Sequence, residues 1–71
     1  MENLVAKMKA AAAKAETDVL VAISVVFAAT TDANEITMLE FVEAELESRL
    51  SEAEFVAHMA TVEAVMDAHA A

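Results

Sequence analysis

Glycine, proline and cysteine are all missing from this 71-residue chain, and its only aromatic residues are three phenylalanines. The tight primed turns that join antiparallel strands need positive φ angles, which residues other than glycine adopt only at a cost, so a β-architecture is disfavoured. Without cysteine, neither a disulfide framework nor a thiolate metal site can form. These absences favour an all-α protein and leave its redox compartment open.

Positive charge is also scarce. The chain has four Lys and Arg against thirteen Asp and Glu, a net charge of −9 at pH 7. Three of the cations, Lys7, Lys9 and Lys14, lie near the start, and Arg49 is the only one that follows. A direct nucleic-acid ligand is disfavoured, because phosphate contacts need clustered Lys and Arg. We expect a protein partner with a basic surface, and an acidic mimic of nucleic acid is an alternative.

Apolar residues, in contrast, make up 59% of the chain, compared with ~45–50% in ordinary globular domains. A domain of this size hides only about 60% of the surface of its unfolded chain. Part of the apolar surface should therefore stay exposed and be covered by another chain. The composition predicts one domain over residues 1–71 that forms a homo-oligomer or binds a dedicated partner.

The longest apolar run extends from Val19 to Ala29 and is interrupted only by Ser24. Eleven residues are too few to span a bilayer, which takes about 20 in a helix. We therefore expect no membrane contact and, by default, a cytoplasmic protein. The run predicts a buried central helix at about residues 19–30, inside a compact four-helix bundle. The remaining helices are expected at 2–15, 38–49 and 52–69, with one continuous helix over 2–30 as the alternative.

Two segments fourteen residues apart share a helix-start pattern. Thr37 and Ser51 each stand three residues before a glutamate, Glu40 and Glu54, and each follows an apolar residue. This spacing matches the capping box, in which the hydroxyl and the carboxylate each accept a hydrogen bond from the other residue's backbone amide. The pattern predicts that helices begin at Thr37 and Ser51.

Oxygen-bearing side chains gather just after the apolar run. They are Asp32, Asn34, Glu35 and Glu40. Carboxylate and amide oxygens are the ligands that Ca²⁺ and Mg²⁺ prefer, so these residues are candidates to hold a divalent cation between two helices. A standard EF-hand loop is excluded, because Ile36 and Thr37 stand where it needs an oxygen ligand and a glycine. The competing interpretation is that Asp32 or Asn34 ends the loop and that Glu40 serves the capping box.

Glu43 and Glu47 continue the acidic face that begins at Glu40 on the predicted third helix. Neighbouring carboxylates four residues apart repel one another. The face is therefore either solvated or turned toward a basic partner, and we take Glu43 and Glu47 as candidate partner-binding residues.

The sequence predicts no catalytic residues. Neither His58 nor His69 has a spacing that pairs it with a serine, although a triad assembled only in space leaves no sequence pattern. Glu54 lies one turn before His58, which favours a surface ion pair over a metal site. We therefore expect a protein that is not an enzyme.

The segment from Val19 to Asp67 resembles the TerB-like family associated with tellurite resistance. The resemblance consists of an apolar helix ending in the acidic loop 31–36, then Thr37 with Glu40, then the helix start at Ser51. In this chain Leu39 stands where the family has a glutamate, and the loop lacks the family's glycine. The resemblance implies an all-helical fold and a cation site in the acidic loop, at the four residues named above.

Together these features predict a small acidic interaction module, such as an inhibitor, adaptor or assembly protein. The alternatives are a divalent-metal-binding TerB-like module that uses loop 32–40, and an acidic nucleic-acid mimic.

Overall fold

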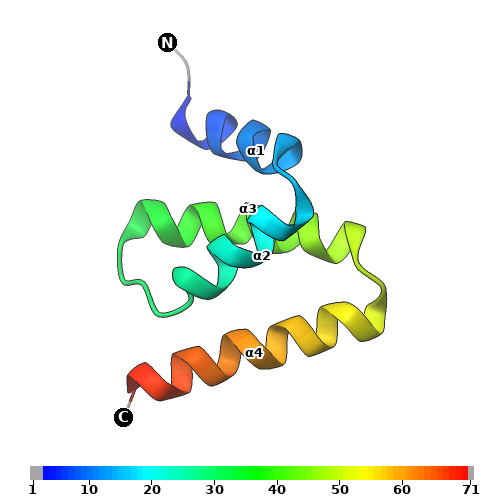
Figure 1. The fold of residues 1–71 in the computed structure, drawn as a ribbon. Helices are drawn as coiled ribbons and strands as arrows, with labels where there is room; N and C mark the ends of the chain where they lie inside the picture. Colours follow the sequence, from blue (N-terminus) through cyan, green and yellow to red (C-terminus); the bar gives the residue numbers. More distant parts are fainter. Residues whose placement is uncertain (1–2, 71) are drawn as a thin grey trace.

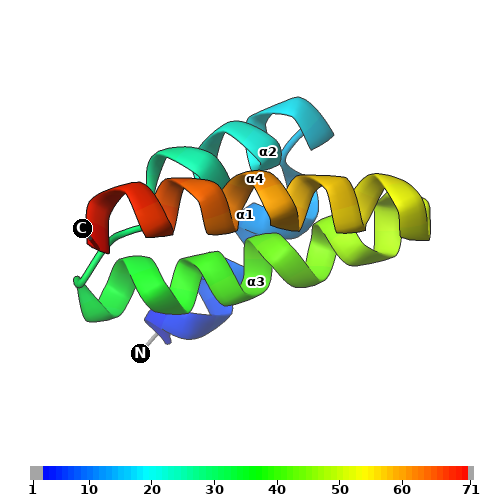
Figure 2. The same ribbon diagram turned by 90° about the horizontal axis from the view of Figure 1, so that it is seen from below.

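The computed structural model describes residues 3–70, which form four α-helices and no strand. They are α1 (Leu4–Lys14), α2 (Thr17–Val26), α3 (Ala33–Arg49) and α4 (Glu52–Ala70). α1 and α4 lie on opposite sides of a layer formed by α2 and α3 (Figure 1). Seen from below, α4 crosses in front of that layer and α1 lies behind it (Figure 2). The predicted all-α, four-helix fold is confirmed.

A sharp break separates α1 from α2, so the alternative of one long helix is wrong. Ala15 and Glu16 have ψ angles of 150° and 151°, which are extended rather than helical. At the other end of α1, the Asn3 side chain accepts a hydrogen bond from the amide of Val5 and caps the helix. α1 can therefore turn away and pack against α3.

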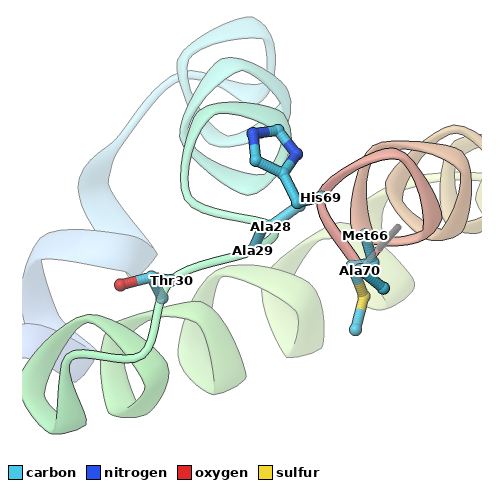
Figure 3. Close-up of a pocket in the computed structure, with 6 residues that line it drawn as sticks. All are labelled: Ala28, Ala29, Thr30, Met66, His69 and Ala70. Atoms are coloured by element: carbon cyan, nitrogen blue, oxygen red, sulfur yellow. The ribbon is translucent and has the colours of Figure 1, made fainter.

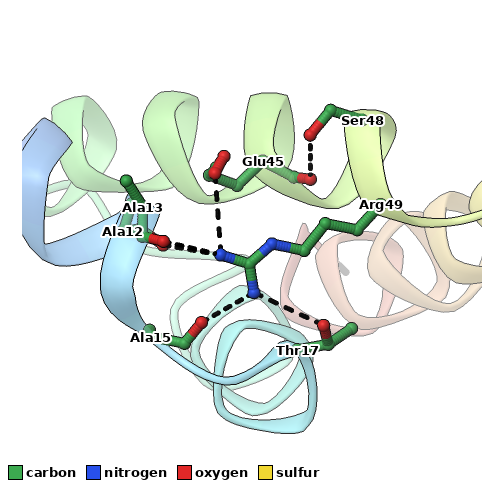
Figure 4. Close-up of polar contacts among 7 residues, drawn as sticks. All are labelled: Ala12, Ala13, Ala15, Thr17, Glu45, Ser48 and Arg49. Atoms are coloured by element: carbon green, nitrogen blue, oxygen red, sulfur yellow. Dashed lines mark hydrogen bonds and ion pairs between the residues drawn. The ribbon is translucent and has the colours of Figure 1, made fainter.

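Arg49 holds this break in place (Figure 4). Its guanidinium donates hydrogen bonds to the carbonyl of Ala15 at 2.6 Å and to that of Ala13 at 3.0 Å. Longer contacts of 3.4 Å reach the Ala12 carbonyl and the Thr17 hydroxyl. These carbonyls belong to the C-terminal end of α1, where a positive charge is favoured. The last residue of α3 thus joins three helices.

The core is small and lies between α1, α2 and α3. Its fully buried members are Ala12, Leu20, Val42 and Leu46. Val42 and Leu46 lie on the inner face of α3, while the small Ala12 lets α1 approach that helix closely. Partly buried side chains, including Phe41 and Phe55, pack around this centre.

The apolar run does not form a helix that is buried on all sides, and this part of the prediction is wrong. Only one stripe, Leu20, Ser24 and Ala28, is buried, at a spacing of four residues. Val19 and Val26 are 46% and 73% exposed, because α2 is covered by α3 and α4 on one side only. α2 also ends at Val26, where the amides of Phe27 and Ala28 close a final turn. Among residues 3–70 no helix combines the length and the apolar character needed to span a membrane.

α3 begins at Ala33, four residues before the predicted start at Thr37. The Asp32 carboxylate accepts a hydrogen bond from the Glu35 amide at 3.0 Å and caps the helix there. Thr37 lies inside the helix, where its hydroxyl donates to the Ala33 carbonyl. The capping box at Thr37 and Glu40 does not form, because Asp32 offers an earlier cap and nothing between 33 and 37 stops the helix.

The second capping box is confirmed. The Glu54 amide donates to the Ser51 hydroxyl at 3.2 Å, and the Ser51 amide donates to the Glu54 carboxylate at 3.0 Å. The predicted Glu54–His58 surface ion pair does not form, because His58 is buried with its Nε2 atom 3.0 Å from the Ser24 hydroxyl. In α4 the buried residues are His58 and Val62, whereas Met66 is 48% exposed.

Candidate functional site

The acidic loop before α3 is held by hydrogen bonds among its own residues. The Thr30 hydroxyl accepts from the Asp32 amide at 3.1 Å and donates to the Glu35 carboxylate. Asp32 in turn caps α3 through the Glu35 amide. Two of the four predicted metal ligands are thus engaged in ending the loop and starting the helix, as the competing interpretation proposed for Asp32.

The other two predicted ligands lie apart from this network. Asn34 and Glu40 are both exposed on α3, and Glu40 lines a groove further along the helix. Within residues 3–70, no group of three or more His, Asp or Glu side chains is placed to hold a metal ion. The structure therefore does not bring Asp32, Glu35 and Glu40 together as a metal centre.

A groove of about 480 Å³ runs between α3 and α4. Large apolar side chains from both helices form its walls: Ile36, Leu39, Met59, Val62 and Met66. Ala28 and Thr30, from the turn after α2, also line it. Val62 is buried at the base of these walls, whereas Ile36 and Met66 are 43% and 48% exposed, so part of the apolar surface of the groove faces solvent.

A second hollow of about 260 Å³ lies at the C-terminal end of α4 (Figure 3). Ala28, Thr30 and Met66 line both hollows, and His69 lines only the second. The His69 ring nitrogen Nδ1 lies 2.9 Å from the Val65 carbonyl in the last turn of α4.

Three carboxylates, from Glu40, Glu43 and Glu63, line the same groove, and no Lys or Arg does. Glu43 is half-buried, and burial raises its pKa above the ordinary value, while the neighbouring His58 acts in the opposite direction. Desolvation disfavours the ionised form of a carboxyl group. A positive charge brought next to Glu43 by a partner would stabilise that ionised form and offset the desolvation. Glu47, the other candidate partner-binding residue, is exposed and does not line the groove.

A buried polar pair that the sequence analysis missed joins α4 to α2. The Nε2 atom of His58 on α4 is 3.0 Å from the Ser24 hydroxyl on α2, and the two residues are 9% and 0% exposed. Together with Glu43 this resembles the residue types of a catalytic triad. Ser24 has no exposed surface, however, so its hydroxyl cannot reach a substrate here, and the pair serves to connect α4 to α2.

One sequence signal pointed toward this pair. Ser24 is the only polar residue in the apolar run, and a hydroxyl buried in such a run requires a hydrogen-bond partner. The identity of the partner was hidden, because His58 is 34 residues away in the sequence.

No protein-family model matches the chain, and neither a curated protein nor a solved structure matches it. The TerB-like resemblance accordingly stays a prediction.

Proposed function

We propose that the chain is a small acidic helical module that binds a protein partner with a basic surface, as an inhibitor, adaptor or assembly protein without catalysis. The observation that carries this proposal is the groove between α3 and α4, which combines apolar walls with three carboxylates and no lining cation. Apolar area supplies affinity in such a site, and complementary charge supplies orientation and partner choice.

The overall charge supports the same conclusion. A net charge of −9 raises the rate of encounter with a basic partner and repels acidic surfaces. This long-range effect is screened by salt, whereas the apolar contacts in the groove are not. Binding should therefore weaken as salt rises without disappearing.

Methyl NMR spectroscopy can locate the binding site directly. Met59 and Met66 line the groove, while Met8 lies on α1, on the opposite side of the α2–α3 layer. Titration with a panel of basic probes, namely poly-lysine, a small basic folded protein and Lys/Leu peptides, should shift the Met59 and Met66 signals and leave Met8 unchanged. A panel in which no probe perturbs the two groove methyls would refute the proposed function.

Self-association is the second part of the proposal, and the exposed outer face of α2 supports it. Val26 is 73% exposed and Val19 is 46% exposed, on a helix that is apolar from Val19 to its end except for the buried Ser24. We expect sedimentation velocity to show association that increases with concentration and weakens in Val26→Ser. A monomer at all concentrations would remove this part and leave the groove proposal intact.

The two alternatives make different predictions. A TerB-like metal module should gain thermal stability on addition of Ca²⁺, Mg²⁺ or Zn²⁺, and calorimetric titration measures that binding. If the chain is a nucleic-acid mimic, its affinity for a basic partner should depend on Glu47 as much as on Glu43. The groove proposal depends on Glu43 and not on Glu47, because Glu47 lies outside the groove.

A further inference from the structure

The groove also restricts the conformation of the segment that binds it. Addition of a β-strand requires an open sheet edge, and residues 3–70 contain no strand. Polyproline segments dock in grooves lined by aromatic residues, and no aromatic side chain lines this one. The remaining common mode is an amphipathic helix laid between two helices.

The dimensions of the groove suit such a helix. The lining residues extend from Ile36 to Glu43 on α3 and from Met59 to Met66 on α4. Each stretch is about 10 Å long at 1.5 Å per residue. A docked helix spans that length in two turns, which places apolar side chains at positions i, i+3 or i+4, and i+7 against the groove walls.

The charges in the groove specify the flanks of the docked helix. Glu43 is half-buried beside the apolar walls, and the titratable residue that acts on it is the neighbouring His58. Glu40 and Glu63 line the groove from different helices. The chain's own lysines lie on α1, across the α2–α3 layer from α4, so they do not line this groove. A Lys or Arg beside the apolar ridge of the incoming helix would meet these carboxylates.

We propose that the groove binds a two-turn amphipathic α-helix of a basic partner protein, and that Glu43 pairs with a Lys or Arg of that helix. This inference rests on the proposed function and adds the conformation of the partner segment and the residue that anchors it. The pair forms at the edge of an apolar contact, where a charge pair is screened less than on an open surface.

Fluorescence anisotropy with two labelled peptides tests this inference. The first is a helix-forming Lys/Leu peptide with leucines at i, i+4 and i+7. The second has the same composition in a scrambled, non-amphipathic order. We expect tighter binding of the amphipathic peptide, a roughly five- to tenfold loss of its affinity in Glu43→Gln, and less than a twofold change in Glu47→Gln. Glu47→Gln is a matched control because it removes the same charge from the same helix outside the groove.

Each other outcome has a defined meaning. Equal affinity for both peptides, or equal losses in the two variants, would overturn the inference while a basic partner remained possible. If no basic probe shifts the methyl signals of Met59 and Met66, the proposed function would be overturned as well. Loss of self-association in Glu43→Gln alone would identify the occupant as a second copy of the chain and would likewise overturn the inference.

Discussion

Arg49 provides the sharpest test of how this fold is held together. It is the only arginine in the chain, and its side chain contacts the end of α1, the start of α2 and Glu45 on its own helix. Replacement by alanine removes all of these contacts without changing the core residues. Replacement by lysine keeps the positive charge but removes the second guanidinium nitrogen, so the side chain can no longer donate to both groups of acceptors with the planar geometry of arginine.

The expected cost can be worked out from the contacts. The two short hydrogen bonds, to Ala15 and Ala13, contribute about 0.5–1 kcal/mol each, because the Arg49 side chain is 25% exposed and water competes for its donors. The charge at the C-terminal end of α1 adds about 0.5 kcal/mol. The 3.6 Å pair with Glu45 adds about 0.3 kcal/mol. Arg49→Ala should therefore cost about 2 kcal/mol, and Arg49→Lys about 1 kcal/mol.

Such a loss is large for a domain of this size. Typical stabilities of about 0.05–0.15 kcal/mol per residue imply about 4–10 kcal/mol for 71 residues. At about 4–8 °C per kcal/mol, Arg49→Ala should lower Tm by about 8–16 °C and Arg49→Lys by about half as much. Thermal unfolding followed by far-UV circular dichroism measures both shifts. An Arg49→Ala protein that melts within about 2 °C of the parent would refute the assignment of Arg49 as the link between α1 and α3.

Other substitutions test the local features. Ser51→Ala should lower the free energy of unfolding, measured in urea, by about 1 kcal/mol, because it removes an N-cap. Thr37→Ala should change it by less than about 0.5 kcal/mol. Equal effects of the two substitutions would contradict the different roles of the two sites. Ser24→Ala should lower the free energy of unfolding by about 1–3 kcal/mol, because it leaves a buried His58 nitrogen unpaired. The double variant Ser24→Ala/His58→Leu should lose less stability than the sum of the losses in the two single variants. Strict additivity would contradict the hydrogen bond between the two buried residues. For Glu43, burial raises the pKa in the folded state, so its stabilising contribution is present below the ordinary pKa and is lost as pH rises through the folded-state pKa. Glu43→Gln should therefore raise Tm at neutral pH more than Glu47→Gln does, with the difference vanishing at acid pH, and a difference that does not depend on pH would argue against this cause.

The two copies of the helix-start pattern show how far local sequence patterns can be trusted. The box at Ser51 forms, and the box at Thr37 does not, although both have the same spacing of hydroxyl and glutamate. The difference lies upstream. Asp32 offers an earlier cap with a favourable side-chain oxygen, and a chain without glycine or proline has nothing to prevent the helix from extending back to it.

The candidate site was predicted only in part. Glu43 was identified as a partner-facing carboxylate and does line the groove, but Glu47, one turn further on the same helix, points elsewhere. The side on which α4 lies decides between them. The Ser24–His58 pair and the groove walls escaped prediction for the same reason, since each joins residues from helices that are distant in the sequence.

The amino-acid sequence by itself determined the helical class, the cap of α4 at Ser51 and the acidic character of the surface. These properties depend on composition and on interactions between residues a few positions apart. Only the tertiary structure decided which stripe of the apolar run is buried, which glutamate meets an apolar wall and where His58 finds its partner. Burial depends on which helices come to lie against each other, and in a nearly uniform apolar run every face fits equally well until a neighbour covers one of them.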